Sequence, residues 1–248
     1  MANIRRVFIS YILLHYLSLI ILIISYFRLE TIHKANFIHR DFHSGNILFD
    51  LKSGKRQQCQ IGDLGLSQPA DYNLSNNEIY GVIPYIAPEI FRGFPFSKES
   101  DVYSFGMIMW EVTTGCKPFA NVEHDHNLIY RIIDGERPEI TNDTPECFAN
   151  LMESCWNSNP KERPSIKKIR ETFGSWFFKS KNKEQFEQAE MKRRELINFK
   201  KLGPEFTEKP HSKAIFTSRP LRSLISKSSS IDSSSLQGIY CASLKNKL

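Results

Sequence analysis

The sequence predicts a mainly α-helical domain with one short β-hairpin, preceded by a hydrophobic helix and followed by a disordered basic tail. Three observations support this prediction. Two short apolar runs, residues 47–51 and 59–61, flank a turn at residues 52–55, as in a hairpin. An apolar stretch from Ser97 to Thr114 is long enough for a central helix. After residue 178 this apolar character gives way to charged and serine-rich segments.

Residues 1–28 form the first predicted unit, a hydrophobic helix. Residues 7–27 contain no Asp, Glu, Lys or Arg, and a helix of that length, at about 1.5 Å per residue, matches a bilayer core. A membrane anchor is therefore one interpretation. A signal peptide is a second, although no small-residue cleavage site follows. Translated non-coding sequence that replaces an upstream region is a third.

The hairpin and the central helix follow from local signals. Because a hairpin folds back on itself, Asn46 before its first strand and Asp63 after its second come to one edge. Ser97 suits a helix N-cap and Gly115 a helix stop. A shorter amphipathic helix is predicted at residues 128–133.

The tail is basic, whereas the rest of the chain is slightly acidic. From Lys179 onward 15 Lys+Arg stand against 7 Asp+Glu, a net of +8, so the total of +6 leaves 18 against 20, or −2, for the remainder. Residues 179–202 alternate charges and predict an exposed helix, and the Ser- and Lys-rich residues 203–248 predict disorder. The predicted folded part has no basic excess, so we expect no nucleic-acid partner.

The cysteine content bears on the compartment. The five cysteines form no CxxC pair and have no metal-like spacing. Free thiols favour a reducing environment, so we expect a cytoplasmic protein, with membrane association if residues 7–27 are an anchor.

Three motifs carry the chemistry of this sequence. They are His39-Arg40-Asp41-Phe42-His43-Ser44-Gly45-Asn46-Ile47-Leu48, Asp63-Leu64-Gly65 and Ala87-Pro88-Glu89. A carboxylate, an amide five residues on and a second carboxylate beside a glycine suit phosphoryl transfer, as a base and two metal ligands. In this order the motifs resemble the large, C-terminal lobe of eukaryotic protein kinases. The resemblance covers residues 29–178, and Cys155-Trp156 with Arg163-Pro164 indicates the tyrosine-kinase-like Ser/Thr type.

The resemblance implies a role for each residue of the site. Asp41 would be the catalytic base, and Asn46 and Asp63 would bind Mg²⁺. Arg40 would pair with a charged group on the activation segment, residues 63–89. The remaining implied roles are His43 at the usual position of a phosphate-holding lysine, Leu48 beneath the adenine of ATP, His39 and Leu64 in packing, Asp101 as acceptor for the catalytic-loop backbone, and Glu89 with Arg163 as a buried ion pair.

The resemblance also shows what this sequence does not contain. The small lobe of the family supplies a glycine-rich loop and a phosphate-pairing lysine. No glycine precedes Gly45, and Lys34 is the only lysine upstream of it. By the same resemblance, the hydrophobic run could be the buried helix that leads into the catalytic loop, with its end at residues 29–33.

The sequence therefore predicts a protein kinase by family, which transfers the γ-phosphate of ATP, with Mg²⁺, to a protein Ser or Thr hydroxyl. As an isolated chain we expect it to be weak or inactive. The alternative is a non-catalytic, pseudokinase-like binding module that offers the large-lobe surface to partners, with or without a membrane anchor. The expected partners are a protein substrate and ATP.

Overall fold

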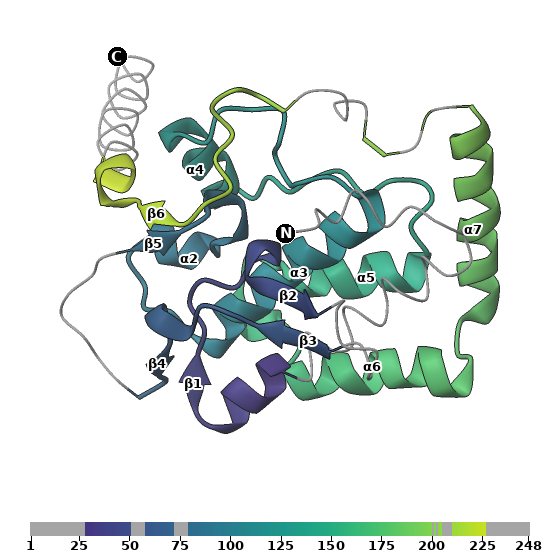
Figure 1. Cartoon of the computed structure of the whole chain (residues 1–248), viewed down its shortest axis with the longest axis horizontal. Coiled ribbons are helices and arrows are strands. Elements are labelled where there is room, and N and C mark those ends of the chain that lie inside the picture. The colour runs from purple at the N-terminus through teal and green to yellow at the C-terminus, as the bar shows by residue number, and fades with distance from the viewer. Residues whose placement is uncertain are drawn as a thin grey trace, which may run out of the picture.

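The computed structural model describes residues 28–50, 58–71, 79–199, 201, 203–204 and 210–226. Within these residues the chain is mostly helical, with short two-stranded antiparallel sheets (Figure 1). The α-helices are α2 (Pro88–Phe91), α3 (Lys98–Thr114), α4 (His126–Ile133), α5 (Glu146–Cys155), α6 (Ile166–Lys179) and α7 (Lys183–Asn198). The strands are β1 (Phe37–Ile38), β2 (Ile47–Asp50), β3 (Gln58–Ile61), β4 (Gln68–Pro69), β5 (Tyr80–Gly81) and β6 (Arg219–Pro220).

The predicted hairpin is present as β2 and β3, which pair with Ile47 opposite Ile61. The other two sheets join segments that are distant in the sequence. β1 pairs with β4, and β5 pairs with β6 from the C-terminal segment. These long-range pairings did not follow from the local sequence pattern.

Helix α3 is the centre of the fold. It begins after Ser97, whose hydroxyl accepts from the Ser100 backbone N–H at 3.2 Å while the Ser100 hydroxyl accepts from the Ser97 N–H at 3.1 Å. It ends at Gly115, as predicted. Every side chain from Asp101 to Glu111 is buried, so the helix is covered on all faces.

The core forms where α3 meets α5 and α6. A Cβ on Gly106 of α3 would lie 2.9 Å from the Cβ of Cys155, so only glycine permits α5 to approach this closely. On α6, the ring of Phe173 packs edge-on against Phe105 at 6.3 Å and Phe148 at 6.2 Å. Such aromatic pairs stabilise a core beyond their buried area.

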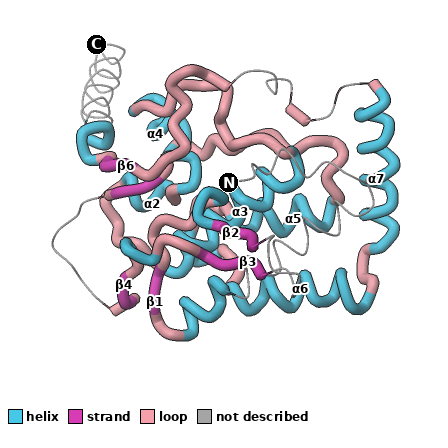
Figure 2. Tube along the Cα trace, in the orientation of Figure 1, coloured by secondary structure: helices cyan, strands magenta, loops and turns pink. Residues whose placement is uncertain are grey.

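Helix α7 lies within the range predicted as an exposed charged helix. Figure 2 shows that a short turn connects it to α6. The ring of Phe186 contacts Trp176 of α6 at 5.5 Å, and Ala189 is buried. Arg193 donates to the Thr113 carbonyl oxygen and lies 3.5 Å from Asp143, so α7 is attached to the domain along one side.

No helix among the described residues is long and apolar enough to cross a membrane. Residues 7–27, on which the anchor and signal-peptide interpretations rest, lie outside the described residues. The predicted end of the buried helix lies within them: residues 28–34 are helical, and Leu29 and His33 are buried. The tail differs from its prediction in one part. Residues 210–226, within the stretch predicted to be disordered, pack against the domain and contribute β6.

Candidate functional site

The catalytic loop, residues 39–46, is held from behind by Asp101 of α3. One Asp101 oxygen accepts from the His39 backbone N–H at 2.8 Å, and the other accepts from the Arg40 N–H at 3.0 Å. The His33 ring donates to the same carboxylate at 2.8 Å. Arg40 has a φ of +71°, a left-handed conformation that these two bonds help to maintain. Asp101, which is 1% exposed, therefore determines the path of the chain into Asp41.

Asp41 lies in this loop with one oxygen unpaired. The residue is 4% exposed, and Oδ2 has no hydrogen-bond partner among the described residues. His43 Nε2 lies 3.7 Å from that oxygen. Burial alone would raise the pKa of Asp41, but interactions with the His43 ring and the Ser218 hydroxyl lower it below its usual value. The carboxylate is thus kept ionised and able to accept a proton.

His43 is oriented by its own loop. Its Nδ1 accepts a hydrogen bond from the Gly45 backbone N–H at 3.1 Å. The proton of a neutral ring is therefore assigned to Nε2, the atom that faces Asp41. A lysine at this position would carry a fixed charge. The His43 side chain is nearly buried: the residue is 7% exposed, and its ring lies 5.9 Å from the Tyr85 ring.

The hairpin brings the two predicted metal ligands to one edge. The Asn46 side-chain amide donates to the Asp41 carbonyl oxygen at 2.9 Å, and its amide oxygen has no hydrogen-bond partner in the part of the chain that the structure describes. The Asn46 carbonyl oxygen accepts from the Gly62 N–H at 2.7 Å, so the residue before Asp63 is bonded to Asn46. Asp63 has a φ of +54° and is exposed. Across the described ranges, no group of three or more His, Cys, Asp or Glu could hold a metal ion.

The two residues predicted to pack, His39 and Leu64, differ in their environments, and Leu48, predicted beneath the adenine, resembles Leu64. His39 is fully buried, packs against the Phe42 ring at 5.6 Å and contacts the Gly62 carbonyl oxygen at 3.3 Å, and burial lowers its pKa. Leu48 and Leu64 are 48% and 53% exposed. Leu64 was predicted to be a packing residue, but its side chain extends from a surface turn, where neighbouring described residues cover only half of it.

Arg40 contacts the activation segment through neutral groups. Its guanidinium donates to the Leu66 carbonyl oxygen at 3.5 Å and lies 4.8 Å from the centre of the Phe96 ring. Burial lowers its pKa. The charged partner expected for Arg40 is not found among the described residues, and residues 72–78 of the activation segment lie outside them.

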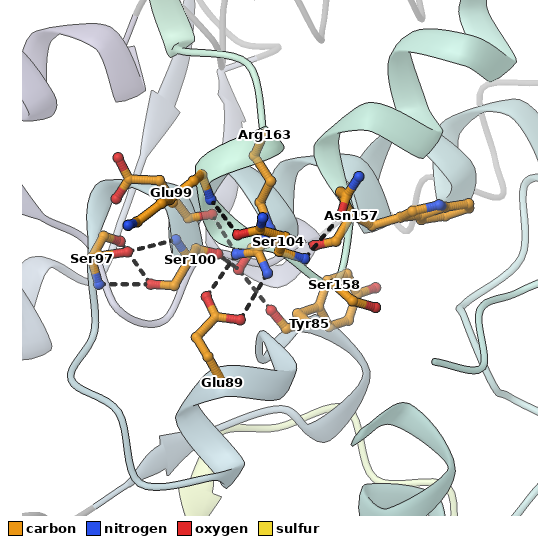
Figure 3. A network of polar contacts seen from close by, with 12 residues as sticks. Tyr85, Glu89, Ser97, Glu99, Ser100, Ser104, Asn157, Ser158 and Arg163 are labelled. Atoms are coloured by element: carbon orange, nitrogen blue, oxygen red, sulfur yellow. Dashed lines mark hydrogen bonds and ion pairs between the residues drawn. The ribbon is translucent and has the colours of Figure 1, made fainter. Parts of the chain in front are cut away.

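Glu89 and Arg163 form the predicted ion pair at the end of the activation segment. The guanidinium donates to both Glu89 oxygens at 2.7 Å each (Figure 3). It also donates to the carbonyl oxygens of Asn157 at 2.8 Å and Glu99 at 3.0 Å. The Arg163 side chain is fully buried, and its charge is satisfied by hydrogen bonds to four acceptors.

Two further polar residues connect distant segments of the domain, and the sequence assigned a role to neither of them. Lys117 bridges the Glu111 carboxylate at 2.7 Å and the Ser44 hydroxyl at 2.5 Å, and so connects the end of α3 to the catalytic loop. His124 is 2% exposed and binds the C-terminal segment. Polar residues in predicted loops carry no sequence signal of burial, because their partners come from distant segments.

In this arrangement a helical lobe holds an Asp-containing loop against a hairpin. Two side chains with oxygen atoms, Asn46 and Asp63, lie at the edge of that hairpin. Proteins that catalyse phosphoryl transfer have such an arrangement. Residues 27–173 match the family model of protein tyrosine and serine/threonine kinases. The match covers more than half of the chain, so the chain belongs to the protein kinase family.

Curated relatives agree with this assignment. The chain is 33% identical to a probable serine/threonine-protein kinase of Dictyostelium discoideum, over 57% of this chain and 8% of that protein. It is 31% identical to a probable LIM domain-containing serine/threonine-protein kinase of the same organism, over 58% and 21%. It is 34% identical to the dual specificity protein kinase shkC, also from this organism, over 56% and 28%. The chain thus spans less than a third of each of these relatives.

Proposed function

We propose that this chain carries the large lobe of a kinase that transfers the γ-phosphate of ATP to a Ser or Thr hydroxyl of a protein. The observation that carries the proposal is the Asp41 carboxylate, which is buried and ionised and has an unpaired oxygen in a loop held by Asp101. A general base needs a free lone pair at a fixed position, and these contacts supply both.

Asn46 and Asp63 are the residues that would hold Mg²⁺. The donor set fits this ion, because an amide oxygen and a carboxylate are hard oxygen ligands, and phosphate oxygens and water complete the usual shell. The bond from the Asn46 amide to the Asp41 carbonyl supports the fit, since it turns the amide oxygen away from the loop. When bound, the ion would neutralise the charge that develops on the phosphates.

The chain's own residues then have separate tasks. Asp41 accepts the proton of the substrate hydroxyl as the oxygen attacks phosphorus. His43 donates through Nε2 near the same position and would hold a phosphoryl oxygen. Asp101 and the pair formed by Glu89 and Arg163 position the catalytic loop and the activation segment, and they touch no reacting atom.

The isolated chain is expected to bind nucleotide weakly. Its residues before Gly45 contain no glycine, and so no glycine-rich loop to cover the phosphates. The alternative function is a binding module that uses the large-lobe surface without catalysis. Nucleotide binding at the hairpin edge separates the two functions.

A titration with ATP and Mn²⁺, a paramagnetic substitute for Mg²⁺, tests the proposal. We expect binding on the order of 1 mM or weaker, with NMR broadening at Asn46 and Asp63. Asp63→Ala should remove the broadening, whereas Asp134→Ala, at an exposed residue after α4, should leave it unchanged. Broadening that is absent, or equal in both variants, would favour the binding module.

A further inference from the structure

The C-terminal segment, residues 210–226, is bound to the domain through His124. The His124 backbone N–H donates to the Lys213 carbonyl oxygen at 3.2 Å, and the Ile215 N–H donates to the His124 ring Nδ1 at 3.1 Å. The Phe216 ring packs edge-on against the imidazole at 4.8 Å, and Arg219 donates to the His124 carbonyl oxygen. One buried histidine therefore fixes an extended stretch of this segment.

After this contact the segment continues as a strand beside the activation segment. In the antiparallel pair of β5 and β6, Gly81 lies opposite Arg219, and the Leu221 N–H donates to the Ile79 carbonyl oxygen at 2.9 Å. Leu221 is fully buried. Figure 1 shows the segment passing α4 to reach β6 beside β5. Strand addition of this kind is a common way to bind an extended peptide.

The pairing brings Ser218 to the catalytic loop. A Cβ on Gly81 would lie 3.4 Å from Asp41 Oδ1, so the strand opposite Arg219 runs directly past the carboxylate. Ser218 directly precedes Arg219, so the pairing places it at the same edge as Asp41, and its hydroxyl helps to lower the pKa of that carboxyl. A serine hydroxyl beside the carboxylate that would act as base has the arrangement of a substrate.

We propose that residues 213–221 occupy the peptide-substrate groove of this lobe and that Ser218 stands at the phosphate-acceptor position. The inference rests on the proposed function. In the transfer step, the Ser218 oxygen forms a bond to the γ-phosphorus of ATP, the bond from that phosphorus to the bridging oxygen breaks to release ADP, and the Ser218 proton passes to Asp41. The segment would also compete with protein substrates for the groove.

The contacts specify the class of peptide that the groove accepts. Two residues before the acceptor, an aromatic ring packs on His124, as Phe216 does. Directly after the acceptor, an arginine reaches the His124 carbonyl oxygen, as Arg219 does. Three residues after it, an apolar side chain fills the site of Leu221. A phosphate on Ser218 would add about two negative charges beside Asp41 and would expel the segment.

Peptide binding tests the docking without nucleotide. The probe is a labelled synthetic peptide with the sequence of residues 210–226, added to the whole chain. Leu221→Asp would place a charge in an apolar site and free the groove, so we expect binding at least tenfold tighter than to the wild type. Arg222→Asp, the same change at the exposed neighbouring residue, should bind like the wild type. Equal affinity of the two folded variants, checked by circular dichroism, would overturn the proposal.

A second measurement decides the position of Ser218 even if Leu221→Asp does not fold. At a fixed pH, the NMR signals of the Asp41 carboxyl carbon and the Gly81 amide should shift in Ser218→Ala, because the strand pairing brings residue 218 beside both groups. Thr217→Ala, at the exposed residue before it, should leave both signals unchanged. Unchanged signals in Ser218→Ala would refute the assignment. A chain that passes both tests but shows no broadening in the titration with ATP and Mn²⁺ would count against the proposed function and would leave the docking intact.

Discussion

The carboxylates behind the catalytic loop and those at its face differ in how their oxygens are satisfied. Asp101 accepts from three donors, and both oxygens of Glu89 bind Arg163. By contrast, Asp41 has an oxygen without a hydrogen bond to any described residue, and Asp63 is exposed and makes no capping bond. An unpaired buried polar group is costly, so its presence indicates a position kept free for a ligand. The paired groups support the fold, and the unpaired groups are available for chemistry.

The largest loss in the free energy of unfolding is expected when the ion pair between Arg163 and Glu89 is broken. Arg163→Ala leaves Glu89 buried without its partner, and such a loss typically costs about 3–5 kcal/mol of the free energy of unfolding. Urea unfolding measures it. Arg131→Ala, which removes an exposed pair with Glu136, is the control and should cost about 0–1 kcal/mol. Similar losses in the two variants would show that the buried pair contributes no more to stability than the exposed pair.

A smaller loss in the free energy of unfolding is expected when Asp101 is changed. Asp101→Asn replaces one acceptor by an NH₂ group that faces a donor, and an unsatisfied buried group costs about 1–3 kcal/mol. Hydrogen exchange at the His39 and Arg40 amides should also accelerate, because both donate to Asp101. Asp134→Asn is the exposed control for the unfolding measurement. Unchanged exchange at both amides would contradict the supporting role.

The buried histidines should make stability depend on pH. Burial lowers the pKa of His39 and of His124 below 6.5 in the folded state. The unfolded chain then binds more protons below that pH, so the stabilising contribution is complete above pH 6.5 and is lost as the pH falls through the folded-state pKa. Urea midpoints at about pH 7.5 and about pH 5 should differ less in His124→Gln than in the wild type.

His126 provides the control for this measurement, because it is only partly buried at the start of α4. His126→Gln should retain the wild-type difference between the two midpoints. A difference that is the same in all three proteins would mean that burial of His124 does not couple folding to protons.

The smallest change in the free energy of unfolding is expected at the half-exposed side chains of Leu64 and Leu48. Leu64→Ala and Leu48→Ala remove half-exposed side chains, so the free energy of unfolding should change by no more than about 0.5 kcal/mol. Leu29→Ala, at a fully buried side chain, should cost about 2–5 kcal/mol in the same assay. A large loss at Leu64 would show that it packs in solution, as the sequence predicted.

Local sequence patterns predicted much of the fold. The Ser97 cap, the Gly115 stop and the hairpin at residues 47–61 depend on residues close together in the chain, and the structure has all three. The spacing of Asn46 and Asp63 predicted that the hairpin brings them to one edge, and the bond from the Gly62 N–H to the Asn46 carbonyl oxygen agrees with that placement, whereas their role as metal ligands stays a prediction. The exposure of Leu64 and the neutral contacts of Arg40 could not be predicted, since both depend on packing between distant segments.

The sequence by itself determined the family, the catalytic loop and the helix that supports it, because motif order, capping and periodicity are properties of short segments. The tertiary structure alone decided the position of residues 210–226. Their Ser- and Lys-rich surroundings lack a hydrophobic period, and so they predicted disorder. Their partners, Ile79, Gly81 and His124, lie about one hundred residues or more away. Only the folded lobe brings these groups together and places β6 beside the activation segment.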